Sequence, residues 1–301
     1  MEENLKEKWM DESSIFLRDI YAFCKQFIDE FNLNNKDNDL SKNAVTNYLV
    51  EWVKLLDSVG ILFYEGRVDT AQILTRSMFE IQLQLCYLIK ESDELEEKAA
   101  FIYVVSNLKR YWFNKNRIEN LKQINKGYST QINSDIIAKL ESNDGIIKTT
   151  YEYIQNKNAI DKSKWNQLSW FKLYSEKHGE KCNNNRSLCE EISFYDVNKD
   201  VKILMYDIIY DKLSQKTHGA ECIDNMIFEN GVQKYRNYNC LQHGYWQLHF
   251  IFKMLLCILY HMFNCFKSNE FSIDSDELGG LHVILKKLEH DFNNLGLEKA
   301  K

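Results

Sequence analysis

The stretch VDTAQILTRSMFEIQLQLCYLIK, residues 68–90, decides the fold of this chain. Its apolar side chains recur at helical spacing and fall on nearly every face of the helix that they predict. A helix that is apolar all round is stable only when other helices cover it, because its exposed faces would otherwise stay in water. Residues 68–90 therefore predict a helix in the middle of a bundle.

The sequence on both sides of this stretch also predicts helices. Ser41 can cap a helix that runs to about Tyr64. Further helical patterns cover residues 13–31, 92–112 and beyond, 134–140, 145–155, 197–216, 239–267 and 274–295. Average usage would give a chain of 301 residues roughly 15 prolines, and this chain has none, which leaves few stops for helices. We expect an all-α fold, a single multi-helix bundle with long central buried helices.

Three segments interrupt the helical pattern. Residues 226–235, MIFENGVQKY, alternate apolar and polar side chains around Asn-Gly, which predicts one short β-hairpin. Residues 165–185 look irregular, and residues 32–39 form a polar break after the first helix. Because no repeat and no shift in composition separates domains, we expect residues 1–40, a helix and linker, to pack on a helical domain of residues 41–301 as one globular unit.

The composition favours a folded cytoplasmic protein. Hydrophobic residues make up 45% of the chain, which is ample for a core and excludes global disorder despite a net charge of −6. None of the eight cysteines forms a C-x-x-C pair, and several fall in apolar helical runs where a reduced thiol acts as a small hydrophobe. The polar N-terminus lacks the apolar segment of a signal peptide. These features predict a reducing, cytoplasmic environment.

Residues 245–266 are the best candidate for a membrane span. Lys253 falls near the centre of this segment, where a charged side chain costs about 2.5–3.5 kcal/mol on insertion scales. Gln247, His249 and His261 add further polar groups. We therefore expect a buried central helix in a soluble protein that has no membrane partner. The alternative is a membrane-active effector.

Arg76 and Glu80 lie four residues apart on the apolar helix, so they share a face and can pair. Charges in such apolar surroundings are costly unless each is satisfied by a partner. One interpretation is a structural clamp that fixes the register of the helix. In the other, Arg76 faces an anion at the floor of a pocket between helices.

Tyr210, Ser214 and His218 form a second group, in which a polar residue returns at every fourth position before Gly219. If the helix persists to Gly219, the three side chains lie on adjoining turns of one face and would line a pocket with the arginine–glutamate pair. Histidine suits proton transfer near neutral pH. The alternative is a histidine that caps the C-terminus of a helix, because its charge complements the helix dipole.

Arg236 and His243 form a third group, seven residues apart. Seven residues are almost two helical turns, so both side chains would point the same way on one helix. Such a pair suits RNA cleavage without a metal ion. The histidine can move the proton of the 2′-hydroxyl or the leaving group while the guanidinium stabilises charge on the phosphate. The alternative is a surface arginine and a partly buried histidine at the start of a long helix.

Two sets of these residues carry a family resemblance. The motif R-S-x-F-E at residues 76–80, followed by Y-x3-S-x3-H-G at residues 210–219, resembles an uncharacterised bacterial helical-domain family over roughly residues 45–267. The motif R-N at residues 236–237, with H-G-Y at residues 243–245, resembles the R-N-x(n)-H signature of HEPN (higher eukaryotes and prokaryotes nucleotide-binding) proteins. Many HEPN proteins are small, dimeric, metal-independent ribonucleases in toxin–antitoxin and anti-phage systems.

The HEPN resemblance implies an endoribonuclease in which Arg236 and His243 are the catalytic pair and Asn237 is their polar companion. His218 is a competing candidate for the histidine, with Lys212 where an arginine would precede it. The resemblance also implies a homodimer, because a two-fold axis would bring a second arginine–histidine pair alongside the first. RNA is then the substrate, and an antitoxin or another protein is a further partner.

Residues 109–117, KRYWFNKNR, are the candidate surface for nucleic acid. Basic and aromatic side chains are interleaved here, which suits neutralisation of phosphates together with stacking of bases. The residues expected to contact RNA are Lys109, Arg110, Trp112, Lys115 and Arg117. The alternative is a solvated helix face whose aromatic side chains turn to the core.

Motifs for metals and cofactors are weak or missing in the sequence. His178, Cys182 and Cys189 offer three ligands, but their spacing matches no standard zinc pattern and suits a polar loop equally well. The chain has no P-loop, no dinucleotide-binding and no nucleophile-elbow motif. We expect no metal and no cofactor. The alternative class of function is a non-catalytic helical module that senses a ligand or holds a protein partner.

Overall fold

The computed structural model describes most of the chain: residues 2–33, 39–124, 134–143, 145–157, 168–192, 206, 226–229, 232–235, 241–266 and 275–294. The helices are α1 (Glu2–Leu33), α2 (Leu40–Tyr64), α3 (Val68–Leu88), α4 (Leu95–Ile124), α5 (Ser134–Ser142), α6 (Ile146–Asn156), α7 (Trp170–His178), α8 (Asn185–Glu191), α10 (Leu241–Cys265) and α11 (Ser275–Asn294). The prediction of an all-α bundle is confirmed. Two short strands, β1 (Met226–Glu229) and β2 (Val232–Tyr235), pair antiparallel in the segment where the sequence predicts a hairpin.

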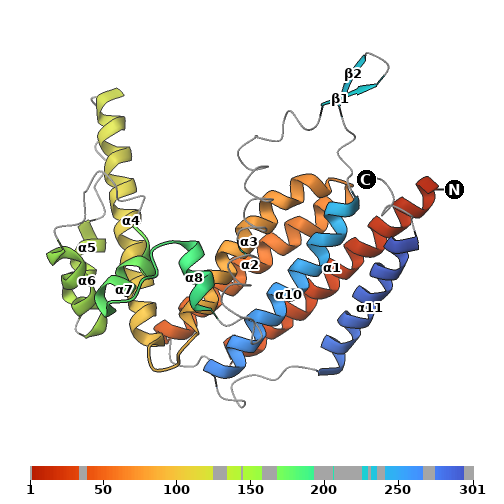
Figure 1. The fold of residues 1–301 in the computed structure, drawn as a ribbon. Coiled ribbons are helices and arrows are strands. Elements are labelled where there is room, and N and C mark those ends of the chain that lie inside the picture. The colour runs from red at the N-terminus through yellow and green to blue at the C-terminus, as the bar shows by residue number, and fades with distance from the viewer. Residues whose placement is uncertain are drawn as a thin grey trace.

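The long helices α1, α2, α3, α10 and α11 run side by side (Figure 1). Helix α2 packs on both α1 and α3, α10 packs on α3, and α11 packs on α1. Helix α4 leaves this bundle at the lower end of the view, and α5, α6 and α7 pack around it. Its later half extends beyond these short helices, away from the bundle (Figure 1). The fold therefore has a packed bundle and a projecting α4.

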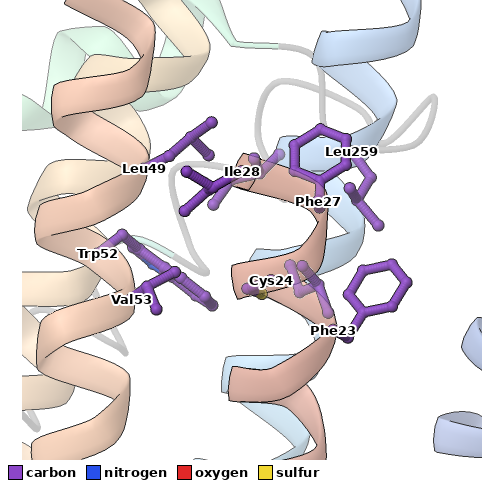
Figure 2. Close-up of a pocket in the computed structure, with 10 residues that line it drawn as sticks. Phe23, Cys24, Phe27, Ile28, Leu49, Trp52, Val53 and Leu259 are labelled. Atoms are coloured by element: carbon purple, nitrogen blue, oxygen red, sulfur yellow. The ribbon is translucent and has the colours of Figure 1, made fainter. Parts of the chain in front are cut away.

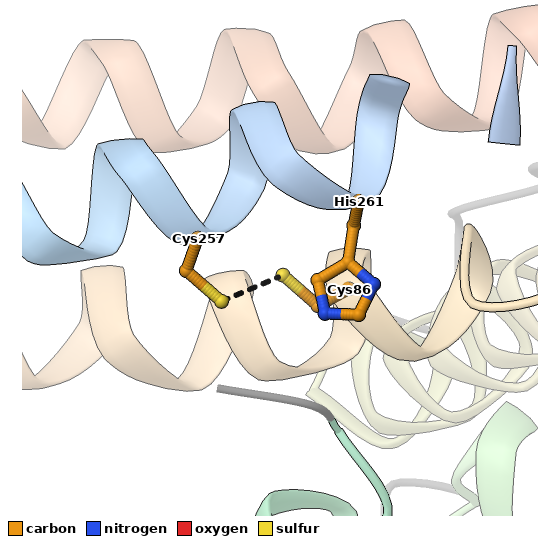
Figure 3. A group of neighbouring side chains, drawn as sticks. All are labelled: Cys86, Cys257 and His261. Carbon is orange, nitrogen blue, oxygen red and sulfur yellow. Dashed lines mark hydrogen bonds between the residues drawn. The ribbon is translucent and has the colours of Figure 1, made fainter. Parts of the chain in front are cut away.

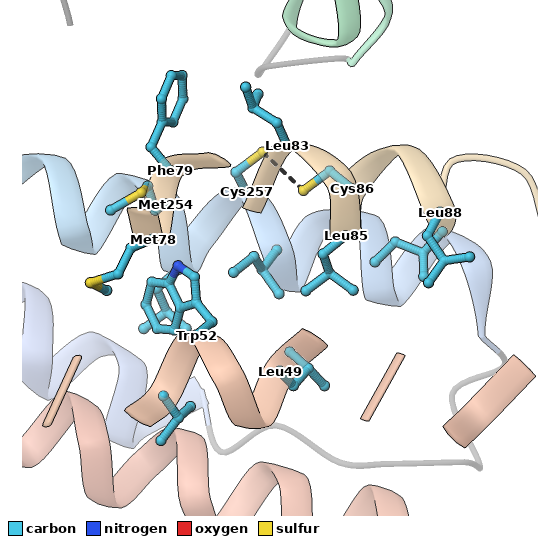
Figure 4. Packing of buried hydrophobic residues seen from close by; sticks show 14 of the residues in the cluster. Leu49, Trp52, Met78, Phe79, Leu83, Leu85, Cys86, Leu88, Met254 and Cys257 are labelled. Atoms are coloured by element: carbon cyan, nitrogen blue, oxygen red, sulfur yellow. Dashed lines mark hydrogen bonds between the residues drawn. The ribbon is translucent and has the colours of Figure 1, made fainter. Parts of the chain in front are cut away.

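Helix α3 lies between α2 and α10, which is the central place that its sequence predicts. Its side chains on both faces are almost fully buried, among them Met78, Phe79 and Leu83 at 0–2% exposure. The Phe79 ring packs 5.3 Å from the ring of Phe250 on α10. Figure 4 shows Met78 beside Trp52 of α2, whereas Phe79 and Leu83 point to the other side of α3. Close packing on both faces explains why apolar residues occur on nearly every face of α3.

The start of α10 is held tightly against α1 and α3. A Cβ atom at Gly244 would lie 3.1 Å from Val68 and 3.3 Å from the ring of Trp9. The indole nitrogen of Trp9 in turn donates a hydrogen bond of 3.0 Å to the carbonyl of Leu288 on α11. A larger residue would require the side chains of Val68 and Trp9 to move by a few tenths of an ångström, so Gly244 suits this close approach of the first turn of α10.

Two predictions about local structure are wrong. Asp39, not Ser41, caps α2, because its carboxylate accepts the backbone N–H of Ser41 at 2.7 Å. The segment 165–185 is not irregular throughout, since Trp170–His178 forms α7. Gly179 ends this helix with a φ of 73°, a left-handed conformation that glycine adopts without strain.

Helix α10 is the one described helix whose length and composition would allow it to cross a membrane. In the structure, 61% of its most apolar window, within Gly244–Cys265, is buried against other helices. Lys253 lies on its exposed side, and Met254 and Leu255 are among its buried residues. This burial is what a core helix of a bundle requires.

A small apolar pocket lies between α1, α2 and α10 (Figure 2). Its walls are the side chains of Phe23, Cys24, Phe27, Ile28, Leu49, Trp52, Val53, Leu255, Ile258 and Leu259. These lining side chains are almost all apolar and carry no charge, so the pocket offers little to orient a polar ligand. It is a gap in the packing of the core.

Candidate functional site

The predicted pair of Arg76 and Glu80 is present on α3. The Nε atom of Arg76 lies 3.1 Å from Oε1 of Glu80, and the side chains are 13% and 33% exposed. Their spacing of one helical turn places both on the face that also carries Phe79. The charged pair therefore sits at the border between the core and the surface, next to the aromatic contact of α3 with α10.

One further residue lies on this face of α3. The ring of Tyr206 is buried and packs 6.0 Å from the ring of Phe79. Tyr206 thus contacts α3 within one turn of the Arg76 pair. Tyr210, Ser214 and His218 lie outside the described residues, so the structure contains the α3 half of the predicted pocket.

The predicted catalytic residues lie at the edge of what the structure describes. Arg236 and Asn237 follow β2 directly and are outside the described residues. The backbone of His243 belongs to the first turn of α10, next to Gly244, and its side chain is outside the described residues. Because α10 begins at Leu241, the two-turn spacing from Arg236 to His243 is not contained in this helix as described.

The basic and aromatic stretch of residues 109–117 lies in the later half of α4. Arg110 and Arg117 are exposed, and Phe113 is 52% exposed. Trp112 packs partly on the core, and the Lys115 ammonium lies 4.9 Å from the centre of its ring. The stretch therefore presents two arginines and one aromatic ring to solvent, while Trp112 turns inward.

Lys109 belongs to the same stretch but differs from the arginines in its burial. Its side chain is half-buried, and burial lowers the pKa of its amine. A lysine in this position supplies less surface charge than Arg110 or Arg117. Of the basic residues predicted to contact RNA, these two arginines are the best placed.

A family model matches residues 42–235 of the chain, which is more than half of it. The chain belongs to the DUF5677 family. DUF5677 is a family of unknown function. No curated protein and no solved structure matches the chain.

The extent of the DUF5677 match separates the predicted site residues into two groups. It includes Arg76 and Glu80 and the segment 210–218, and it ends at Tyr235. Arg236, Asn237 and His243 lie beyond it. The HEPN-like motif therefore belongs to a part of the chain that the DUF5677 model does not cover, although α10 from that part completes the core around α3.

A group of metal-ligating side chains that the sequence analysis missed lies between α3 and α10. Cys86 on α3 and Cys257 and His261 on α10 are buried, and their ligating atoms lie within 4.8 Å of one another. The two sulfur atoms are 3.8 Å apart. Figure 3 shows the three side chains converging from the two helices. The spacing Cys257-x3-His261 is the signal that could have pointed to it, since i and i+4 share a helix face.

His178, Cys182 and Cys189, the three ligands that the sequence suggested, have other contacts. His178 binds Glu97 through Nε2 at 3.2 Å and stacks on the ring of Tyr174. The thiol of Cys182 lies 3.9 Å from the carbonyl of Ser187. Within the described part of the chain, these three residues do not form a group of metal ligands.

Lys98 was also missed by the sequence analysis. Its side chain is 1% exposed, and its ammonium binds Glu94 at 2.7 Å and the carbonyl of Tyr87 at 3.0 Å. The rings of Tyr87 and Tyr174 enclose it at 4.6 and 5.3 Å. Every partner comes from the ends of α3 and α4 or from α7, so this lysine joins three helices.

Proposed function

We propose that this DUF5677 protein is a HEPN-like effector that binds RNA and cleaves it by metal-independent arginine–histidine chemistry, with a role as a toxin or in anti-phage defence. The observation that carries the proposal is the projecting half of α4, which presents Arg110, Phe113 and Arg117 to solvent. Guanidinium groups bind phosphate oxygens in a bidentate manner, and an exposed ring offers a surface on which a base can stack.

The proposed chemistry requires Arg236 and His243, with Asn237 as their companion and His218 as the competing histidine. An imidazole exchanges a proton near neutral pH, and a guanidinium offsets the charge that develops on the phosphate. HEPN proteins generally act as dimers, and we expect a homodimer whose two-fold axis pairs the catalytic residues of both protomers. We also expect a cytoplasmic protein with an antitoxin or another protein as its partner.

Binding and cleavage would take place at separate sites in one protomer. The later half of α4 and the start of α10, which contains His243, lie on opposite sides of the molecule (Figure 1). A strand held by α4 must therefore be long, or must reach the catalytic residues of a second protomer. Substitutions on α4 should consequently raise the KM of a long RNA substrate and leave its kcat unchanged.

The first test measures binding of a labelled single-stranded RNA by fluorescence anisotropy at several salt concentrations. The logarithm of the affinity falls linearly with the logarithm of the salt concentration. The double variant Arg110→Ala/Arg117→Ala should make this dependence shallower by about 1.4, because each lost phosphate contact removes about 0.7 from the size of the slope. Phe113→Ala should weaken binding by about 1–3 kcal/mol through lost stacking. Lys54→Ala, which removes an exposed charge from α2, is the matched control. Equal affinity of all four proteins would end the proposal for α4.

The second test measures cleavage of RNA by the wild type, His243→Ala and His218→Ala, with EDTA present. The proposal expects the wild type to remain active and His243→Ala to lose activity. Activity that survives His243→Ala but not His218→Ala would transfer the role to His218. Activity in both variants would remove the two histidines from the mechanism.

A second function is favoured by the position of Arg76 and Glu80. A charged pair at the border of the core, beside the buried Tyr206, suits the floor of a pocket for an anionic ligand. The protein would then be a ligand-sensing or protein-binding module without catalysis. Absence of RNA cleavage by the wild type, together with binding of inorganic phosphate that a stable Arg76→Ala variant loses, would support this function.

A further inference from the structure

We propose that Cys86, Cys257 and His261 form a buried structural zinc site that joins α3 to α10. The inference is independent of the proposed function, because it concerns the stability of the bundle and not RNA. Three neutral or anionic donors of the types that zinc prefers converge here from two helices (Figure 3). Zinc sites with two cysteines and one histidine among their ligands are well known in proteins.

The distances fit a tetrahedral ion. With Zn–S bonds of about 2.3 Å, two thiolates of a tetrahedral site stand about 3.8 Å apart. The sulfur atoms of Cys86 and Cys257 are separated by 3.8 Å, and the group of three fits within 4.8 Å. Cys257 and His261 are one turn apart on α10, so their backbone already directs both side chains to the same side. Little movement is needed to bind the ion.

Gln82 supplies a candidate for the fourth ligand. It lies one turn before Cys86 on α3 and is completely buried, and its Nε2 atom is 3.9 Å from the Cys86 sulfur. Its Oε1 atom is buried without a hydrogen-bond partner among the described residues. Rotation of the amide would direct this oxygen to the ion. An unsatisfied buried carbonyl costs about 1–3 kcal/mol, and coordination would remove that cost.

The charges of the ligands also suit a divalent ion at this buried site. Two thiolates cancel the charge of Zn²⁺, so the occupied site has no net charge to desolvate. Binding releases one proton from each thiol to solvent.

The site would explain how α10 is held to the part of the chain that matches DUF5677. Cys86 lies inside the matched residues 42–235, whereas Cys257 and His261 lie beyond them. The ion would thus crosslink positions 171 residues apart. A closed site with three or four protein ligands is the arrangement of a structural ion, which adds its binding energy to folding.

The test begins with the metal content of the full-length protein purified under reducing conditions. We expect about one zinc per chain. Growth with cobalt should give a protein with the intense ligand-field bands of tetrahedral Co²⁺ and a thiolate-to-cobalt charge-transfer band. Cys257→Ser should lose the zinc and both spectral features. Cys24→Ser, which alters a buried cysteine of α1 far from the group in sequence, should keep them.

Two further variants test the ligands individually. If Cys257→Ser does not fold, His261→Gln should fold with a shifted cobalt spectrum, and Gln82→Leu should move the ligand-field bands but not the charge-transfer band. Wild-type protein without zinc and without a cobalt spectrum would overturn the site. Copper in place of zinc, or a Cys86–Cys257 disulfide found by intact mass, would overturn it as well. None of these outcomes depends on whether the protein cleaves RNA.

Discussion

Two ion pairs of the same spacing occupy different surroundings in this molecule. Arg76 pairs with Glu80 on α3 at 3.1 Å, and Lys98 pairs with Glu94 at the start of α4 at 2.7 Å. Both follow the one-turn spacing that brings side chains together on a helix. The Arg76 side chain is 13% exposed, whereas the Lys98 side chain is 1% exposed. Equal spacing in sequence therefore gives two different environments.

Lys98 has the surroundings expected of a buried charge with a structural role. Its ammonium has a carboxylate, a backbone carbonyl and two aromatic rings around it, contributed by three helices. Arg76, in contrast, pairs within its own helix, at the rim of the core and next to Tyr206. The lysine is needed where it is for the helices to pack. The Arg76 side chain is more exposed than that of Lys98, so the arginine pair is the better candidate for a ligand site.

The largest expected effect is on the free energy of unfolding when alanine replaces the cation of each pair. Lys98→Ala should lower the free energy of unfolding by about 3–5 kcal/mol, because it leaves a cavity and removes the buried ammonium that binds the Glu94 carboxylate and the Tyr87 carbonyl. Arg76→Ala should lower it by about 1 kcal/mol, as for a pair near the surface. Urea denaturation followed by circular dichroism measures both.

The control for this pair of variants is Lys54→Ala, which breaks an exposed one-turn pair on α2 and should change stability by less than about 0.5 kcal/mol. If Arg76→Ala unfolds the protein and Lys98→Ala does not, the two roles are reversed. Arg76 would then be the clamp, and the proposed anion pocket would lose its support.

The next effect is smaller and depends on pH. Burial acts to raise the pKa of Glu94, but the hydrogen bond and charge of Lys98 outweigh it, so the pKa lies below its ordinary value of 4.5. Stability from a lowered carboxylate pKa is present above that ordinary value and is lost as the pH falls through the pKa of the folded state. Wild-type protein should therefore lose stability below pH 4.5.

Lys98→Met tests this source of the pH dependence, since methionine fills the space without the charge. Its urea midpoint should fall less than that of the wild type between about pH 5.5 and about pH 3.5. Glu97, whose pKa is lowered by Lys177 and His178 against the effect of burial, contributes equally to both proteins. Parallel curves for the two proteins would show that Lys98 does not set the pKa of Glu94.

The helical bundle could be predicted from sequence because its signal is local. In α3, residues within a few turns of one another already carry the apolar pattern that decides its burial. Helix α7 was missed because its apolar side chains are less clearly confined to one face than those of α5, a helix of the same length that the sequence did predict. The cap of α2 was assigned two residues too late, since Asp39 and Ser41 are both capping residue types and only the backbone geometry distinguishes them.

The sites depend on positions far apart in the chain, and for that reason the sequence gives less of them. Arg76 and Glu80 were found because they are neighbours on one helix. Lys98 is enclosed by Tyr174, a residue from α7, and no pattern around Lys98 indicates that contact. Cys86 and Cys257 meet only because α3 and α10 pack together. The Cys257-x3-His261 spacing was visible in the sequence, but its third ligand was not.

The smallest expected effect separates charge from shape at Arg76. Arg76→Lys keeps a cation one turn from Glu80 and should change the free energy of unfolding by less than about 0.5 kcal/mol. Lysine lacks the planar fork that binds carboxylate or phosphate with two parallel hydrogen bonds. If Arg76 faces an anionic ligand, the lysine variant should be stable and yet lose affinity for an anion such as inorganic phosphate. Unchanged affinity together with full stability would assign Arg76 to the packing of α3, as Lys98 is assigned to the junction of α3, α4 and α7.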